Sequence, residues 1–365
     1  MITNLELKNF KCFKKIKISL SNINILTGIN GMGKSTIIQS ILLIKQSGKI
    51  FDESKELLLN GKYVNLGLGQ DVLYEKADDD EIEINLSVDN ASEKSIYGYS
   101  ARRDALPLMD VNIDGDIESL YRTIDRIVYL SAYRIPPRMT YGIENDDYLE
   151  KREFSKEGEY AVQYLKMHDG DTVINSNVII GDGVNITLAA QVNEWLNMIS
   201  PGVSPIIAVN QSARNVELRY EYIEDRNKTN SYKSVNVGFG ITYVLPIVVA
   251  LVSSKPNDII IIENPEAHIH PRGQRMLGEL IARAGAGGAQ VIVETHSDHI
   301  LNGIRVATKK GLANSRSTGI FFFYRDNDDS YAHKVIKPIL GSDGRIDDWP
   351  DGFFDEWDNA LMELL

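Results

Sequence analysis

The fold is decided by the stretch Gly28-Ile-Asn-Gly-Met-Gly33-Lys34-Ser35-Thr36. It fits the pattern G-x-x-x-x-G-K-[ST] and lies between a strand predicted at Ile23–Leu26 and a helix predicted over Ser35–Lys45. Glycines in such a loop let backbone N–H groups converge on phosphate oxygens, and the following helix presents its positive end to the anion. The stretch therefore predicts a P-loop that binds ATP.

Polar side chains of this loop have separate expected roles. Lys34 is expected to reach the β- and γ-phosphates, Ser35 to ligate Mg²⁺, and Thr36 to contact the α-phosphate. The backbone part of the predicted site comes from Asn30, Gly31 and Gly33. ATP and Mg²⁺ are thus the predicted cofactors.

A second motif is Asp258-Ile-Ile-Ile-Ile-Glu263-Asn264-Pro265-Glu266. Four consecutive isoleucines are typical of a strand buried on both faces. A carboxylate at the carboxyl end of such a strand lies where open α/β sheets bind their ligands. Glu263 is therefore the second predicted magnesium ligand.

Two further motifs follow the same logic. Val291-Ile-Val-Glu-Thr295-His296-Ser297-Asp298 is an apolar strand ending in polar groups, and His296 there can hydrogen-bond a γ-phosphate or the attacking water. Gly238-Phe239-Gly240 precedes a predicted helix, and this turn is either a second anion cradle or an ordinary helix start.

Composition restricts the classes of function. The chain has 365 residues, a net charge of −12 and one cysteine, Cys12. This charge argues against a protein whose whole surface binds nucleic acid. It does not exclude one basic groove, because five lysines lie between Lys8 and Lys17. No apolar run is long enough for a bilayer and the N-terminus has no leader, so we expect a cytoplasmic protein without a membrane partner.

The order of predicted elements indicates an α/β fold with a mixed sheet. Residues 2–7, 16–20 and 82–88 alternate apolar and polar side chains, which is typical of antiparallel strands. Strands and helices then alternate from Gly238 onward, as in a parallel sheet. We expect one composite ATPase domain with an N-terminal lobe over 1–90, an inserted α+β region over 91–235 and a C-terminal lobe over 236–365.

Taken together, the four motifs resemble ABC-type AAA ATPases of the RecF, SMC and OLD kind. The opening Leu5-x-Leu7-x-Asn9-Phe10-Lys11 is similar to the first strand of those proteins. Within the group, the chain resembles a bacterial family with a C-terminal Trp-Pro-x-Gly-Phe-Phe-Asp segment, here Trp349–Asp355. No sustained heptads predict a coiled-coil arm, which separates the chain from true SMC proteins.

The resemblance implies a homodimer or higher oligomer of ATPase heads, with two ATP molecules held between the heads of a head-to-tail pair. Each P-loop would face the partner's signature turn, which Gly238, Phe239 and Gly240 would form. By the same resemblance, Lys11 would approach the nucleotide from the first strand, and His296 would be the switch histidine.

Asn264 departs from the pattern of these ATPases. They usually follow the metal-binding acid with a glutamate that polarises the attacking water, whereas an amide has no basic carboxylate. Glu266 or His296 could supply the missing group. Otherwise hydrolysis is slow, and ATP serves mainly to hold the dimer.

Two classes of function fit these motifs. In the first, which the resemblance implies, the chain is a regulatory ATPase of a bacterial anti-phage defence system and controls a separate effector such as a nuclease. In the second, it is a DNA repair or maintenance ATPase that clamps DNA directly. We expect no nuclease within the chain, because little sequence follows Glu294–Ser297.

Two clusters allow a structural and a functional interpretation. His268, His270, His296 and His299 invite a metal site, but the ATPase motifs already account for three of them. Trp349, Phe353, Phe354 and Trp357 are expected to fold back onto the core, with a docking surface for a partner as the alternative.

Overall fold

The computed structural model describes residues 1–48, 56–181, 185–224, 227–325 and 333–364. The chain forms two compact units, and each is described by itself. Unit 1 contains residues 1–127, 319–339 and 348–365, and unit 2 contains residues 128–318 and 340–347.

An antiparallel sheet makes up much of unit 1. Its strands alternate buried and more exposed side chains, as β5 does, because successive side chains point to opposite faces. Leu5 of β1 faces Ile18 of β2 on one side and Leu86 of β5 on the other. The strand order is β2 (Phe13–Ser19), β1 (Ile2–Phe10), β5 (Glu81–Val88), β6 (Ala91–Gly98), β7 (Ala105–Asp114) and β4 (Glu56–Leu58).

A second set of strands in unit 1 leads into the P-loop. The strand β3 (Ile23–Gly28) is almost wholly buried and neighbours β16 (Thr318–Arg325), which pairs with β17 (His333–Ile336). Helix α1 (Lys34–Ser47) follows β3 and ends at Gly48, whose φ of 77° suits a glycine stop. Lys45 of α1 donates to the carbonyls of Asp125 and Ile127, close to the end of α2 (Ile117–Asp125).

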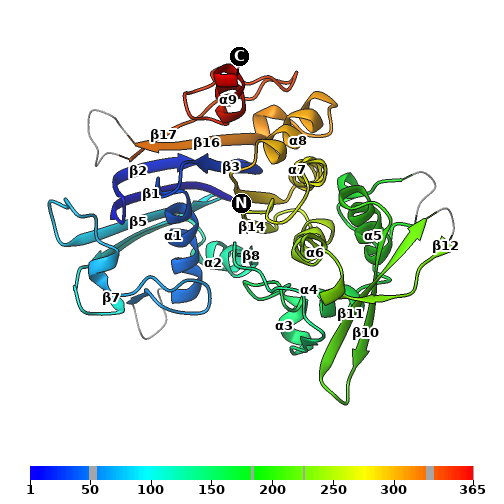
Figure 1. The fold of residues 1–365 in the computed structure, drawn as a ribbon. Helices are drawn as coiled ribbons and strands as arrows, with labels where there is room; N and C mark the ends of the chain where they lie inside the picture. Colours follow the sequence, from blue (N-terminus) through cyan, green and yellow to red (C-terminus); the bar gives the residue numbers. More distant parts are fainter. Residues whose placement is uncertain (49–55, 182–184, 225–226, 326–332, 365) are drawn as a thin grey trace. The chain divides into compact units, whose positions relative to one another are not determined.

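Unit 2 is built on parallel strands. In β14 (Ile259–Glu263) and β15 (Gln290–Glu294) the register pairs Glu263 with Glu294, so both strands end at one edge. The strand β8 (Ile127–Leu130) neighbours β14. The helices around these strands are α6 (Phe239–Val252), α7 (Pro271–Ala286) and α8 (Asp298–Lys309) (Figure 1).

Glycines allow α7 and α8 to pack closely. A Cβ on Gly278 would lie 2.3 Å from the Ile300 carbonyl oxygen, and one on Gly303 would lie 2.2 Å from that of Arg275. The two backbones therefore touch where no side chain intervenes, and this contact fixes how α8 leaves the end of β15.

The remainder of unit 2 combines short helices with a small antiparallel sheet around β11 (Figure 1). Trp195 of α5 is fully buried and donates its indole N–H to the carbonyl oxygen of Val178 at 2.7 Å. The strands are β9 (Tyr141–Gly142), β10 (Val203–Asn210), β11 (Asn215–Glu224), β12 (Asn227–Lys228) and β13 (Tyr232–Lys233). The helices are α3 (Asp146–Glu150), α4 (Ala161–Met167) and α5 (Leu188–Ile199). The short 3₁₀ turns of the chain are η1 (Gly69–Asp71), η2 (Ser176–Val178), η3 (Ser234–Asn236) and η4 (Ser315–Ser317).

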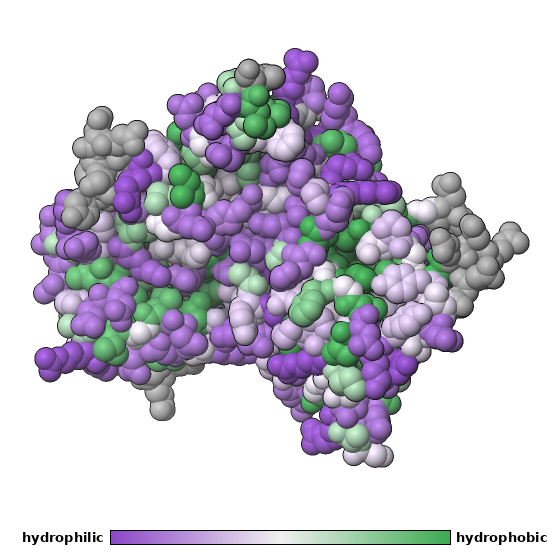
Figure 2. All heavy atoms as spheres, viewed as in Figure 1, coloured by the Kyte–Doolittle hydropathy of each residue, from purple (hydrophilic) through white to green (hydrophobic). Residues whose placement is uncertain are grey.

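The aromatic C-terminal segment divides into a buried and an exposed part. Phe353 is fully buried, with its ring centroid 5.5 Å from that of Phe322 in β16, so the predicted packing onto the core is confirmed there. Helix α9 (Glu356–Leu364) instead exposes large side chains, and Figure 2 shows some green spheres where α9 lies in Figure 1. These are Trp357, Leu361, Met362 and Leu364.

The predicted elements are present in the structure with small shifts at their ends. The alternation over residues 2–7, 16–20 and 82–88 gives β1, β2 and β5, and the run of isoleucines gives β14. The predicted α/β class with a mixed sheet is confirmed. Across the described residues the longest helix, α7, has 16 residues, so no long coiled-coil arm is present there. Among these residues no helix is long and apolar enough to cross a membrane. The expected lobes at 1–90, 91–235 and 236–365 stay a prediction.

Candidate functional site

Glycines shape the P-loop in unit 1. Gly28, Gly31 and Gly33 have φ values of 132°, 79° and 102°, a region that other residues rarely adopt. A Cβ on Gly28 would lie 2.2 Å from the Phe323 carbonyl oxygen. One on Gly33 would lie 2.3 Å from Phe13 Cζ and 2.8 Å from Cys12 Sγ. The loop can thus take this course only with bare backbone at these two close approaches.

The N-terminus of α1 has the features of an anion-binding site. Its N-cap is Gly33, which provides no side-chain cap, and its first turn contains no acidic residue. The positive end of the helix is therefore not offset by a carboxylate of its own first turn, which suits it to a bound anion. Lys34 is buried, and its Nζ donates to the carbonyl oxygens of Gly28 and Ile29 at 2.8 and 2.9 Å.

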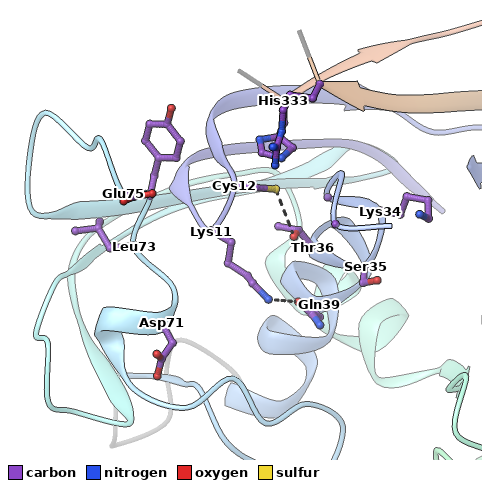
Figure 3. Close-up of a pocket in the computed structure, with 14 residues that line it drawn as sticks. Lys11, Cys12, Lys34, Ser35, Thr36, Gln39, Asp71, Leu73, Glu75 and His333 are labelled. Atoms are coloured by element: carbon purple, nitrogen blue, oxygen red, sulfur yellow. Dashed lines mark hydrogen bonds between the residues drawn. The ribbon is translucent and has the colours of Figure 1, made fainter. Parts of the chain in front are cut away.

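A pocket of about 780 Å³ opens over this helix start. In Figure 3, Lys11 points to Gln39, to whose Oε1 it donates at 2.8 Å, and Cys12 Sγ lies 3.7 Å from Thr36 Oγ1. Burial lowers the pKa of Lys11 and raises that of the half-buried Cys12 thiol. The lining residues are Lys11, Cys12, Gly31, Gly33, Lys34, Ser35, Thr36, Gln39, Asp71, Leu73, Tyr74, Glu75, Arg325 and His333.

Eight of these fourteen lining residues were not predicted as site residues from the sequence. Gln39 lies one helical turn beyond Ser35, and its polar side chain within an apolar helix was the available signal. The lining residues from Asp71–Glu75, β16 and β17 belong to no recognisable sequence motif. They become visible only when the fold brings distant segments to one pocket, where the His333 ring lies 6.2 Å from that of Phe13.

The residues of unit 1 fit a nucleoside triphosphate with its metal. The glycine cradle, the uncapped start of α1 and the ammonium group of Lys34 supply donors and positive charge. Ser35 lies in the first turn of the same helix and lines the same pocket. The pocket volume also falls in the range usual for small-molecule sites, about 300–1,000 Å³.

In unit 2, the carboxylate of Glu263 is held at the end of β14. It accepts hydrogen bonds from Tyr129 Oη and from the N–H of Ala132, both at 3.2 Å. Burial raises the pKa of Glu263, although the Ala132 and Tyr129 hydrogen bonds act in the opposite direction. A bound cation would favour the ionised form of this carboxyl group. The role of Glu263 as a metal ligand stays a prediction.

Arg134 stabilises the same turn through hydrogen bonds to its backbone. It is almost fully buried, and its guanidinium group donates to the carbonyl oxygens of Ser131, Glu263 and Asn264 at 2.8, 2.7 and 2.6 Å. Burial lowers its pKa to about 10, so the group stays charged near neutral pH. None of the sequence motifs contains this residue.

The remaining predicted catalytic residues lie in the loops after β14 and β15. Asn264 has a φ of 44° and donates its backbone N–H to the Glu294 carbonyl oxygen at 2.8 Å. The carboxylate of Glu266 accepts from Thr295 Oγ1 and from the backbone N–H of His296, both at 2.8 Å. The structure therefore brings Asn264, Glu266 and His296 together, and His296 is exposed.

The predicted signature turn begins α6. A Cβ on Gly238 would meet nothing within 4 Å, whereas one on Gly240 would lie 2.2 Å from the His268 carbonyl oxygen. Phe239 between them is 56% exposed, and the first turn of α6 contains no acidic residue. The helix start is thus open at Gly238 and tightly packed at Gly240.

The histidines have ordinary structural partners. His268 packs against Tyr243 with ring centroids 4.8 Å apart, and His270 Nδ1 accepts from the N–H of Arg272 at the start of α7. His299 Nδ1 lies 3.6 Å from an Asp298 carboxylate oxygen. In the parts of the chain that the structure describes, no three His, Cys, Asp or Glu side chains are grouped as metal ligands.

Carboxylates offset the lysines of the N-terminal strands. Lys8 pairs with Asp79 at 2.7 Å, Lys14 with Asp78 at 2.8 Å, and Lys15 with Glu6 at 2.9 Å. A strand surface neutralised in this way attracts nucleic acid phosphates less than the bare lysine count suggests.

Comparison with protein families supports an ATPase. A model described as "AAA ATPase domain" matches residues 1–168. A second, described as "AAA domain, putative AbiEii toxin, Type IV TA system", matches residues 194–302. A third, "Protein of unknown function (DUF3696)", matches residues 314–364, which include Trp349–Asp355. The first two matches contain the P-loop and the strand ends of β14 and β15, respectively.

Individual relatives agree with these matches. An OLD nuclease from Thermus scotoductus is 19% identical over 374 residues, which cover 95% of this chain and 68% of that protein. The Smc head domain with a coiled coil and joint from Pyrococcus yayanosii aligns with a TM-score of 0.57 at 12% identity, covering 99% of each chain. The Smc head domain bound to the C-terminal domain of ScpA, derived from Pyrococcus furiosus, gives 0.53 at 14% identity, covering 100% of this chain and 99% of that one. The fold is that of an ABC-type ATPase head, and the family matches support an ATPase of the ABC-like AAA group.

Proposed function

We propose that the chain is an ATP-driven regulatory subunit that dimerises around ATP and controls a separate effector protein in bacterial anti-phage defence. The observation that carries the proposal is the glycine cradle of Gly28–Thr36 at the uncapped start of α1, which lines a pocket of suitable size. The relative called an OLD nuclease and the match described with the AbiEii toxin support a defence setting. We also assign the chain to the bacterial family with the Trp349–Asp355 segment and to the cytoplasm.

In this proposal Lys34 binds the phosphates, and Ser35 and Glu263 are the protein ligands of Mg²⁺. Mg²⁺ supplies charge neutralisation on the phosphates when it is bound. Asn30, Gly31 and Gly33 contribute backbone N–H groups, Thr36 a hydroxyl and Lys11 a cation. His296 contacts the terminal phosphate or the attacking water.

The second half of each site comes from a partner copy. Gly238, Phe239 and Gly240 are suited to this role because the start of α6 has no acidic residue and Gly238 has free space around it. The exposed Phe239 would be covered by the partner, as aromatic side chains often are at interfaces. Head-to-tail pairing would then place two nucleotides between two chains.

The critical measurement is the mass of the purified protein with and without Mg²⁺ and ATP, by light scattering after size exclusion. Wild type is expected to be a dimer or higher oligomer with ATP, and Lys34→Ala to lose both ATP binding and association. Gly238→Asp is expected to keep ATP binding and to lose association, because a carboxylate would repel the partner's γ-phosphate. A wild-type protein that remains monomeric with saturating ATP contradicts the proposal.

The same samples distinguish the alternative function. Binding of duplex DNA that grows with ATP and weakens steeply with salt would favour a DNA repair or maintenance ATPase. The lysine–carboxylate pairs of the N-terminal strands and the net charge of −12 support the effector model instead. That model expects ATP-dependent assembly with a second protein and no such DNA binding.

A further inference from the structure

One carboxylate in unit 2 joins the loops that follow the two parallel strands. Glu266 lies in the loop after β14, and Thr295 and His296 directly follow β15. Glu266 Oε2 accepts from Thr295 Oγ1, and Oε1 accepts from the N–H of His296, each at 2.8 Å. Each oxygen of this side chain is thus engaged by the neighbouring loop.

Further hydrogen bonds hold the donors in place. Thr295 is fully buried, and its Oγ1 accepts from the N–H of Ser297 at 3.0 Å while it donates to Glu266. Ser297 caps α8 by accepting from the N–H of Ile300, and its hydroxyl donates to Gln274 Oε1. Gln274 in turn donates to the carbonyl oxygen of Ile269, which lies in the loop of Glu266.

This arrangement has a consequence for catalysis. A carboxylate oxygen that accepts one hydrogen bond keeps a second lone pair, so its orientation decides whether it can direct that lone pair at the reacting water as a general base. The Glu266 carboxylate is oriented by two donors on a loop whose own geometry is fixed. It holds the backbone of His296, which is an exposed residue.

We infer that Glu266 and Thr295 form a clasp that positions His296, and that Glu266 does not act as the base that Asn264 lacks. Glu266 and Thr295 are positioning residues in this assignment, since they act through His296. The inference rests on the proposed ATPase function, because His296 acts on nucleotide only there.

Thr295→Val tests the clasp with little change of shape, because valine keeps the branched side chain and removes the hydroxyl. We expect kcat for ATP to fall about tenfold while KM stays within about twofold, since the loss concerns an interaction needed in the transition state. Thr295→Ser restores the hydroxyl and should recover most of kcat. Equal losses in both variants would mean that packing, and not the hydrogen bond, matters, and would overturn the inference.

A double-mutant cycle identifies the residue through which the clasp acts. In a His296→Ala background, Thr295→Val should cause no further loss of kcat, because the positioned group is gone. Glu266→Gln should lose about as much as Thr295→Val, and the two losses should not multiply. A Glu266→Gln loss that far exceeds that of Thr295→Val and multiplies with it would make Glu266 the base and would overturn the assignment.

Hydrogen exchange provides a readout that does not need turnover. The His296 amide should exchange faster in Thr295→Val and Glu266→Gln than in wild type and in Thr295→Ser. All four proteins should have the same melting temperature, so that the faster exchange reports local opening. Unchanged exchange would contradict the clasp even if activity fell. The His296 amide could also exchange faster in the two variants, as expected, while the wild-type protein shows no ATP turnover. That result would support the clasp and contradict the proposed ATPase function.

Discussion

At the scale of single residues, two glycines of the P-loop look equivalent in the sequence but have different surroundings in the structure. Gly31 and Gly33 both have positive φ, so an alanine at either position carries a backbone cost of about 1–2 kcal/mol. A Cβ at Gly31 meets nothing within 4 Å, whereas one at Gly33 would collide with Phe13 and Cys12. We expect Gly33→Ala to lose ATP binding and to melt at lower temperature, and the matched Gly31→Ala to show only the smaller backbone effect. Calorimetry with an ATP titration measures both, and equal effects in the two variants would contradict the explanation.

Single residues also show the limit of prediction from sequence. The sequence identified Glu263, Asn264, Glu266 and His296 because each follows an apolar strand. It left open whether Glu266 or His296 replaces the missing glutamate, since that choice depends on which groups donate to each carboxylate oxygen. Those donors, Thr295 Oγ1 and the His296 N–H, lie about thirty residues further along the chain.

At the scale of elements, periodicity predicted the parts of the fold with one strongly buried face. The predicted β5 and α1 bury apolar side chains at the expected spacings of two and of three to four residues. The long region from residue 91 looked irregular, yet it contains β6, β7, β10 and β11. Strands such as β7 and β10 leave most of their side chains partly or fully exposed, so no continuous apolar face marked them in the sequence.

The start of α6 gives a prediction at this scale. Gly240→Ala would place a Cβ 2.2 Å from the His268 carbonyl oxygen, so helix and loop must separate. We expect it to lower the free energy of unfolding by about 1–3 kcal/mol, the usual cost of overpacking. Gly238→Ala is the control, because that position has a φ of −57° and open space. Denaturant unfolding followed by circular dichroism would compare the two, and a stable Gly240→Ala protein would show that the contact is not a constraint.

At the scale of the whole molecule, the motifs of the predicted site are divided between two compact units. The P-loop, Lys11 and the pocket belong to unit 1, while Glu263, Asn264, Glu266, His296 and Gly238–Gly240 belong to unit 2. Sequence motifs identified both sets, because each motif is local. The pocket wall from Asp71–Glu75, β16 and β17 was not predicted, because only tertiary folding assembles it.

Slow ATP turnover is the property of the whole molecule that follows from both sets of residues. Asn264 provides no carboxylate, and Glu266 is engaged by Thr295 and His296, so neither supplies a ready base for the attacking water. We expect steady-state phosphate release at saturating Mg²⁺ and ATP to stay below about 10 per second, a typical enzyme median. Lys34→Ala provides the background rate. Asn264→Asp supplies a carboxylate of similar size, and aspartate tolerates the φ of 44°, so this variant should turn over ATP several-fold faster than wild type. Wild-type turnover well above ten per second would show that another group acts as the base, and that ATP does more than hold two copies together.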